Sequence, residues 1–210
     1  MKLYSFSLAP NAMRVGAFLK EKGIELEVQE LDVRAGQQFE EPFQSMNPFN
    51  CVPFLELDNG SIISESISIC RYLEEIYPKP QLFGSNAEEK AVIDMWNRRL
   101  ELDALSPMGH AIRNKLPMFE GKVLAGTRNN IEQSSVVIER GMQMLNLFME
   151  RVDPHLATSD FIAGPHFTVA DITGYFIFAG CIRLEFEIPK NFTNVLNWKS
   201  RIIDRDCFKL

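Results

Sequence analysis

Glu65 and Ser66 have the chemistry needed to hold an amino-acid head group. They stand where an apolar, strand-like segment (61–64) gives way to a helical pattern. A helix N-terminus presents unpaired backbone N–H groups and the positive end of the helix dipole, so it favours a carboxylate. Ser66 adds a hydroxyl group and Glu65 can hold an ammonium group, so the pair predicts a site for an α-amino acid. The alternative is that both residues only cap the helix.

Val52 and Pro53 open another apolar segment, 52–57. Proline has no N–H to donate, which disfavours a central, fully paired place in a sheet. A cis Val52-Pro53 bond would turn the backbone N–H and C=O of Val52 outward, where they could pair with an extended peptide. The alternative is a trans proline at the start of a strand, because only about 5–6% of X–Pro bonds in folded proteins are cis.

The elements that must position these residues follow from the pattern of residues 1–78. Asp-Asn-Gly at 58–60, between two apolar runs, predicts a hairpin. Asn11 is expected to cap the first helix and Gly23 to end it. Strands are expected at 2–7, 25–33, 52–57 and 61–64, with helices at 13–23 and from 64 or 65 to 77, and room for a short helix within 35–49. This β-α-β-(α)-β-β-α order predicts a thioredoxin-like domain.

The rest of the chain predicts an all-helical domain at 87–210, joined to the first by a linker at 79–86. Helical stretches are expected at 87–119, 129–152, 168–181 and 192–204, on the spacing of their apolar residues. The first should bend near Pro107 and Gly109. Thr168 and Asp171 have the spacing of a variant capping box, which is a structural role.

Composition excludes several classes of function. The formal net charge is −6, and neither half of the chain is basic, so a nucleic-acid surface is not expected. No apolar run is long enough to cross a membrane and no signal peptide is visible, so we expect a cytoplasmic protein. The four cysteines are far apart and the three histidines lack ligand spacing, so no metal site is expected.

Four segments together resemble the cytosolic glutathione transferases over essentially the whole chain. They are LYSFSLAPNAMRV (3–15), NPFNCVPFLEL (47–57), GSIISESISICRYLE (60–74) and FIAGPHFTVADI (161–172). The resemblance implies a thioredoxin-like domain followed by a transferase-type helical domain, a homodimer, and glutathione as co-substrate with no further cofactor.

The same resemblance assigns the glutathione anchors. Pro53 is expected to be cis, and Val52 to pair with the cysteinyl backbone of glutathione. Glu65 and Ser66 would bind the γ-glutamyl group. The glycyl end would meet Gln38 and Asn50.

The residue that stabilises the thiolate is less obvious. Members of the family place a Tyr, Ser or Cys near the end of the first strand, whereas this chain has Ala9-Pro10-Asn11 there. Asn11 is the first candidate, because the Pro-Asn-x-x-Arg pattern is similar to that of bacterial Nu-class members, although Asn11 could merely cap the helix. Ser7 is the second candidate and Ser5 the third. Whether Tyr4 faces the site cannot be read from the sequence.

Two further features concern the ligand sites. Cys51 replaces a basic residue that often helps to hold a glutathione carboxylate in the family. The second substrate is expected between the domains, in a pocket lined by Leu8, Trp96 and Arg99, with Met108 and Phe119 as further candidates.

The resemblance implies a glutathione S-transferase that transfers alkyl or aryl groups of small electrophiles to the thiolate, as in detoxification. The Pro-Asn pattern leaves open a glutathione-dependent disulfide reductase. Ala9 and Cys51 leave open a non-catalytic binding or regulatory protein of the same fold.

Overall fold

The computed structural model describes residues 1–209, which form two compact units. The first unit comprises Met1–Pro80 with two later segments, Ala125–Thr127 and residues 206–209. The second comprises Gln81–Leu124 and Arg128–Arg205. Two short pieces of the chain that follow the predicted linker therefore belong with the N-terminal unit. Among residues 1–209, no helix is both long enough and apolar enough to cross a membrane.

The first unit has the predicted thioredoxin-like order. Its elements are β1 (Lys2–Ser5), α1 (Pro10–Lys22), β2 (Glu27–Glu30), the 3-10 turn η1 (Gln37–Phe39), α2 (Phe43–Met46), β3 (Phe54–Glu56), β4 (Ile62–Ser64) and α3 (Ser66–Ile76). The strands form one sheet in the order β2-β1-β3-β4, with β1 parallel to β2 and the other pairs antiparallel. The predicted fold class and the hairpin at 58–60 are confirmed.

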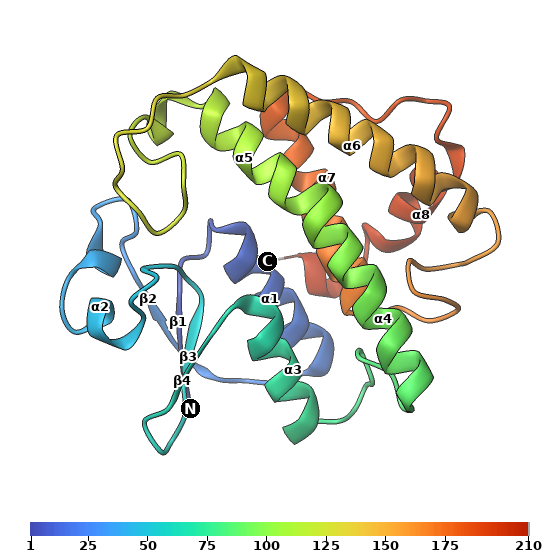
Figure 1. Ribbon diagram of the computed structural model, residues 1–210. Coiled ribbons are helices and arrows are strands. Elements are labelled where there is room, and N and C mark those ends of the chain that lie inside the picture. Colours follow the sequence, from blue (N-terminus) through green and yellow to red (C-terminus); the bar gives the residue numbers. More distant parts are fainter. Residues whose placement is uncertain (210) are drawn as a thin grey trace. The chain divides into compact units, whose positions relative to one another are not determined.

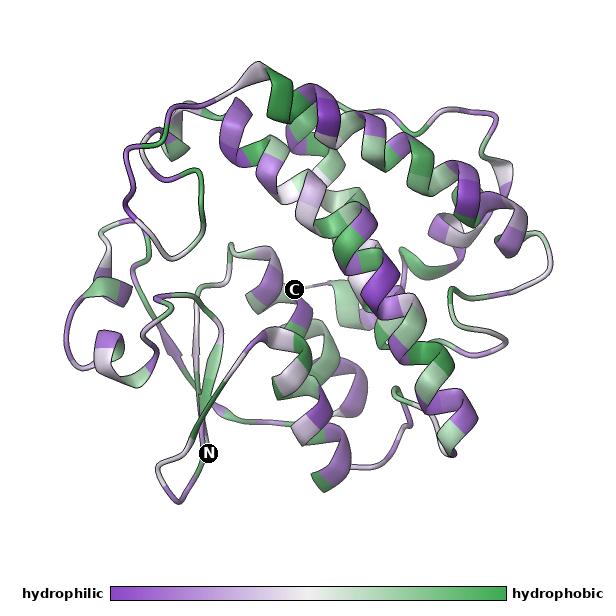
Figure 2. Cartoon of the chain, in the orientation of Figure 1, coloured by the Kyte–Doolittle hydropathy of each residue, from purple (hydrophilic) through white to green (hydrophobic). Residues whose placement is uncertain are grey.

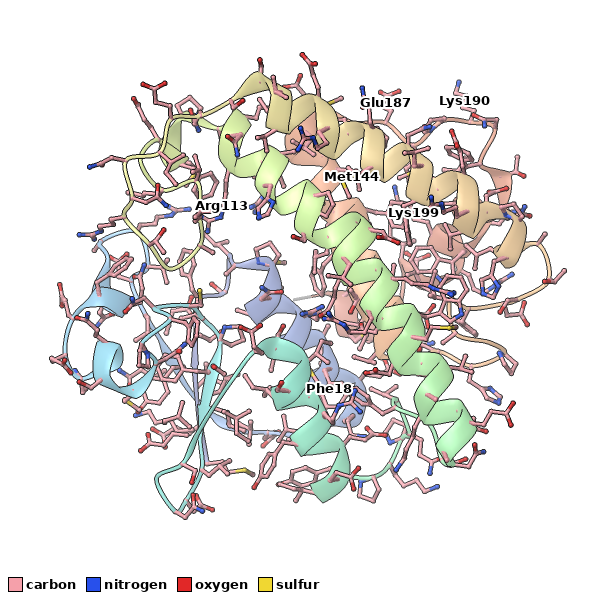
Figure 3. All side chains as sticks on the ribbon, in the orientation of Figure 1. Phe18, Arg113, Met144, Glu187, Lys190 and Lys199 are labelled. Atoms are coloured by element: carbon pink, nitrogen blue, oxygen red, sulfur yellow. The ribbon has the colours of Figure 1, made fainter. Side chains whose placement is uncertain are left out.

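Successive side chains of β1 point to opposite faces of the sheet, so this unit has buried side chains on both faces. Figure 1 shows α1 and α3 on one face and α2 on the other. On the α2 face, Tyr4 stacks on Phe54 with ring centroids 4.6 Å apart and meets Phe43 edge-on at 5.8 Å. On the other face, Phe18 of α1 is fully buried beside α3 (Figure 3).

Helix α1 begins one residue before the cap that the sequence suggested. Ala9 is the N-cap residue, and no side chain caps the helix. Pro10 takes the first helical position, where its fixed φ suits a helix and its missing N–H costs nothing. The prediction that Asn11 caps this helix is therefore wrong, because Asn11 lies inside the first turn. Gly23 ends the helix in the left-handed conformation, with φ +63°, as predicted.

The second unit is all-helical, as predicted. It contains α4 (Ala87–Leu100), the π-helical turn η2 (Glu101–Leu105), α5 (Ser106–Lys115), the 3-10 turn η3 (Pro117–Phe119), α6 (Ser135–Leu156), α7 (Val169–Leu184) and α8 (Thr193–Ile202). A last 3-10 turn, η4 (Asp206–Phe208), belongs to the first unit and contacts α1. Polar and apolar residues alternate around α4, α5 and α6, as expected for amphipathic helices (Figure 2).

The predicted long helix at 87–119 is divided by the π-helical turn η2, which ends directly before Ser106 and Pro107. Proline has no N–H to donate to the carbonyl one turn earlier and its ring crowds that carbonyl. A single wider turn relieves this conflict without ending the helix. The irregularity therefore precedes Pro107, and Gly109 lies within regular α5.

Helix α7 is buried along most of its length and begins with the predicted capping box. The backbone N–H and the hydroxyl of Thr168 both donate to Asp171 Oδ2, at 2.9 and 3.2 Å. Asp171 Oδ1 accepts from the Ile162 N–H at 2.9 Å and from Trp198 Nε1 at 2.8 Å. Burial raises the pKa of Asp171 to about 6, and these four hydrogen bonds oppose that rise. One ionised side chain thus ties the start of α7 to the preceding loop and to α8.

Replacing Asp171 with Asn should destabilise the protein markedly. An amide has one oxygen instead of two, so its NH2 group would face at least one of the buried donors. Leaving buried donors unpaired costs about 1–3 kcal/mol each, so we expect Asp171→Asn to lower the free energy of unfolding by roughly 2–4 kcal/mol in urea titrations. Asp160→Asn is the matched control, since the Asp160 side chain is mostly exposed and forms a surface ion pair with Arg201 at 3.4 Å. Equal losses for the two variants would contradict this role.

Candidate functional site

The sheet topology gathers the chemistry-bearing segments at one edge. The register pairs Tyr4 with Phe54 and Phe54 with Ser64. Since β3 runs antiparallel to both neighbours, the end of β1, the start of β3 and the end of β4 lie side by side. The chain leaves β1 toward α1, enters β3 through 52–53 and leaves β4 into 65–66. The candidate residues of three separate segments therefore meet at this edge.

Glu65 has a strained backbone at the junction of β4 and α3. It occupies the N-cap position with φ +72° and ψ 119°, and its side chain makes no capping hydrogen bond. Positive φ is unfavourable for a residue with a Cβ atom and typically costs about 1–3 kcal/mol. The side chain is exposed. The geometry leaves the carboxylate available to a ligand beside the N-terminus of α3.

Ser66 is the point where α1 and α3 meet. It is 1% exposed, and its Oγ accepts hydrogen bonds from Arg14 Nε at 3.2 Å and from Arg14 Nη2 at 2.5 Å. The same Oγ lies 3.5 Å from Asn11 Oδ1. Figure 1 shows α1 and α3 side by side, with their N-terminal ends on the same side. Asn11, Arg14 and Ser66 thus form one hydrogen-bonded group at two helix N-termini.

Asn11 is exposed in the first turn of α1, so it is reachable from solvent. Its Oδ1 faces the Ser66 hydroxyl, which leaves the Nδ2 amide to donate elsewhere. Among residues 1–209, Nδ2 has no hydrogen-bond partner. An amide N–H at a helix N-terminus can stabilise an anion, because the donor and the helix dipole act together.

The Val52-Pro53 peptide bond is cis, as the resemblance implied. Val52 lies outside the paired register of β3, which begins at Phe54. Its backbone is therefore available for pairing with an extended ligand at this edge of the sheet.

Gln38 and Asn50 each hold a buried oxygen atom. Gln38 lies in η1, and neither its Oε1 nor Asn50 Oδ1 has a hydrogen-bond partner among residues 1–209. Asn50 has a left-handed backbone, with φ +52°, and its Nδ2 donates to Pro48 O at 3.2 Å and to Gly126 O at 3.4 Å. Buried polar atoms without a partner are uncommon, so both positions suit a ligand that donates hydrogen bonds.

The segment Ala125–Thr127 packs against the loop that holds Asn50, although some 75 residues separate them. Gly126 adopts φ +69°, and a Cβ atom there would lie 2.0 Å from Phe49 O and 2.8 Å from Cys51 Sγ. Cys51, which forms no disulfide, has a half-buried thiol beside this backbone. The sequence carried no signal for the contact beyond the glycine itself.

The remaining candidates occupy different surroundings. Tyr4 faces the core, where its hydroxyl donates to Glu56 Oε2 at 2.8 Å, and burial together with Glu56 raises the pKa of Tyr4 to about 12. Tyr4 therefore points away from the group formed by Asn11 and Ser66. Ser5 is buried at the end of β1, and Ser7 is exposed in the following turn.

The residues expected to line a second-substrate pocket lie in both units. Leu8 is exposed in the turn before α1 of the first unit. In the second unit, the Trp96 ring stacks on His155 with centroids 4.2 Å apart, and the Arg99 guanidinium lies 4.9 Å from the Trp96 ring centroid. The pocket and the homodimer stay predictions. Residues 1–209 contain no group of three or more His, Cys, Asp and Glu side chains placed to hold a metal ion.

Gly126→Ala should disrupt the packing of 125–127 on the loop at 49–51. The new Cβ atom would collide with backbone that cannot move freely, so we expect a loss of about 1–3 kcal/mol in the free energy of unfolding beyond the cost of the positive φ. Cys51 should also react faster with a thiol reagent, while the other three cysteines are buried.

Gly121→Ala is the matched control for this change. Gly121 lies in the same connection between α5 and α6 with nearly the same φ, +66°, but a Cβ atom there meets only Asn130 Oδ1, at 3.5 Å. If the two variants lose the same stability and leave Cys51 equally reactive, the close contact does not matter to the loop.

Comparison with known proteins gives two family matches that together span most of the chain. Residues 3–81 match the model of the glutathione S-transferase N-terminal domain, and residues 103–206 match that of the glutathione S-transferase C-terminal domain. Glutathione S-transferase 2 of Saccharomyces cerevisiae is 29% identical, across all of this chain and 88% of its own length.

Two solved structures have the same fold. A class Gtt2 glutathione S-transferase of Vibrio parahaemolyticus is 33% identical with a TM-score of 0.84, covering 100% of this chain and 96% of that one. A glutathione S-transferase domain-containing protein of Marinobacter aquaeolei VT8 is 29% identical with a TM-score of 0.90, covering 99% and 100%. None of these three descriptions favours the disulfide-reductase alternative.

Proposed function

Because the chain belongs to the glutathione S-transferase superfamily, we propose that it is an enzyme that transfers small electrophiles to the sulfur of glutathione. The observation that carries the proposal is the convergence of Asn11 and Ser66 at the N-termini of α1 and α3, with Oδ1 and Oγ 3.5 Å apart. One helix start offers a place for a carboxylate and the other offers a donor for a thiolate.

Glutathione would lie along the edge where β1, β3 and β4 meet. Its γ-glutamyl carboxylate would accept the backbone N–H of Ser66 at the start of α3, and Glu65 would hold its ammonium group. The cysteinyl backbone would pair with Val52 next to the cis proline. The peptide N–H near the glycyl end would suit the buried oxygen atoms of Gln38 and Asn50. The γ-glutamyl head group, the cysteinyl backbone and the glycyl N–H then each have a partner of complementary charge or hydrogen-bonding type.

The enzyme's chemical task would be to keep the sulfur ionised. A free thiol with a pKa of about 8.5 is only a few per cent thiolate at pH 7. A donor at a helix N-terminus stabilises the thiolate and lowers that pKa. The thiol proton would leave to solvent, the sulfur lone pair would form the new bond to the electrophilic carbon, and the leaving group would depart with its bonding electrons. Asn11 would donate through Nδ2, and Ser7 is the second candidate.

Removing both γ-glutamyl anchors should abolish binding to glutathione. We expect wild-type protein to be retained on immobilised glutathione and the double variant Glu65→Ala, Ser66→Ala to flow through, because the ammonium partner is lost and α3 loses the Oγ atom that ties its N-terminus to Arg14 of α1. Ser68→Ala, an exposed serine on the same helix, is the control and should be retained like the wild type. Retention of the double variant would show that the γ-glutamyl group binds elsewhere.

Asn11→Ala should raise the pKa of bound glutathione and slow turnover, with little change in glutathione affinity. A single well-placed neutral donor to a developing anion contributes on the order of 10²–10³ in rate at most, and sharing with the helix dipole reduces that figure. The measurement is thiolate ultraviolet absorbance against pH, beside kinetics with a chlorinated aromatic substrate.

Ser7→Ala is the matched control for Asn11, because Ser7 is an exposed neutral residue just before the same helix. Its titration curve should stay close to that of the wild type. A shift for Ser7→Ala without one for Asn11→Ala would identify Ser7 as the thiolate donor. If neither curve moves, backbone N–H groups must perform this task or the protein is not a catalyst.

A further inference from the structure

Arg14 is a buried cation on the face of α1 that meets α3. Its side chain is 4% exposed, and arginine is almost never this buried unless its donors are engaged. It follows Asn11 by three residues, so both side chains lie on one face of the helix. Two nitrogen atoms of the guanidinium, Nε and Nη2, donate to the same oxygen, Ser66 Oγ.

This two-pronged contact determines the direction of the Ser66 hydroxyl. A guanidinium has only donors and no acceptor, so Ser66 Oγ must accept from it and its own proton must point elsewhere. The oxygen that lies in reach is Asn11 Oδ1, at 3.5 Å. An amide whose oxygen is held in this way presents its NH2 group on the opposite side. Arg14 therefore orients the Ser66 hydroxyl, and the Ser66 hydroxyl in turn orients the Asn11 amide.

Cys70, Glu74 and Lys22 are further titratable groups between α1 and α3. Burial raises the pKa of the Cys70 thiol to about 12, and the nearby Arg14 offsets only part of that rise, so Cys70 stays neutral. The buried carboxylate of Glu74 is held by Lys22 Nζ at 2.6 Å.

We propose that Arg14 is a positioning residue that holds Ser66 Oγ, and through it the Asn11 amide, so that Asn11 Nδ2 faces the sulfur of bound glutathione. This inference rests on the proposed function and adds to it a residue that does not itself touch the ligand. Lysine is a poor substitute, because a single ammonium group on a flexible stem cannot reproduce the planar fork of arginine.

The first measurement needs no ligand. The Asn11 side-chain NH2 signals are followed by nuclear magnetic resonance in wild type, Arg14→Met, Ser66→Ala and the double variant. Arg14→Met should shift these signals in the wild-type background and should have no further effect once Ser66 is alanine. Equal effects in both backgrounds would overturn the coupling through Ser66. Arg14→Lys should give a shift between wild type and Arg14→Met, and it serves as the second variant if Arg14→Met does not fold.

The second measurement is the thiolate titration of bound glutathione. The midpoint for Arg14→Met should rise by roughly one pH unit, which is a tenfold change in the thiolate equilibrium, with Arg14→Lys between the two. Arg71→Met is the matched control, because it removes an exposed guanidinium from α3, and its midpoint should stay near that of the wild type.

The two measurements separate failure of this inference from failure of the proposed function. If the wild type binds glutathione as the thiolate and the midpoint of Arg14→Met is unchanged, only the proposed role of Arg14 is overturned. A wild type that shows no bound thiolate would overturn the proposed function and the role of Arg14 toward sulfur with it. If the thiolate midpoint shifts equally in Arg71→Met and Arg14→Met, the shift comes from loss of positive charge in general. That result would overturn the positioning role of Arg14.

Discussion

The contact between Arg14 and Ser66 is the interaction on which the candidate site depends. It joins the second turn of α1 to the first residue of α3, 52 residues further along the chain, and it lies inside the core of the first unit. The antiparallel placing of β3 between β1 and β4 brings those helix starts to one edge of the sheet. Without that topology, neither the exposed amide of Asn11 nor the carboxylate of Glu65 would stand near the cis peptide at Pro53.

Local patterns in the sequence predicted those features whose causes are local. The hairpin at 58–60, the left-handed stop at Gly23 and the capping box of Thr168 and Asp171 each depend on a few neighbouring residues. The role of Arg14 was out of reach, because a charged residue in an amphipathic helix is normally expected on the surface. Its burial depends on a serine supplied by another helix.

The structure differs from the sequence-based prediction in two further places, and the spacing of residue types along the chain does not reveal either cause. Asn11 looked like a cap, but Pro10 is better suited to the first helical position, so the helix starts earlier. The segment at 125–127 joins the first unit through backbone packing of Gly126 on Phe49. Contacts made by backbone atoms leave no hydrophobic pattern, so the sequence could only mark the position with a glycine.

Side chains cap some helix starts of this chain and leave others open. Helix α4 is capped by Asn86, which accepts from the Glu89 N–H, and α7 is capped within its own segment by Thr168 and Asp171. The N-cap residues of α1, α3, α6 and α8 make no side-chain capping hydrogen bond. Uncapped N–H groups cost stability unless water or a ligand accepts them. Helices α1 and α3 are two of these uncapped helices, and they meet at Ser66, where an anionic tripeptide would supply acceptors for their N–H groups.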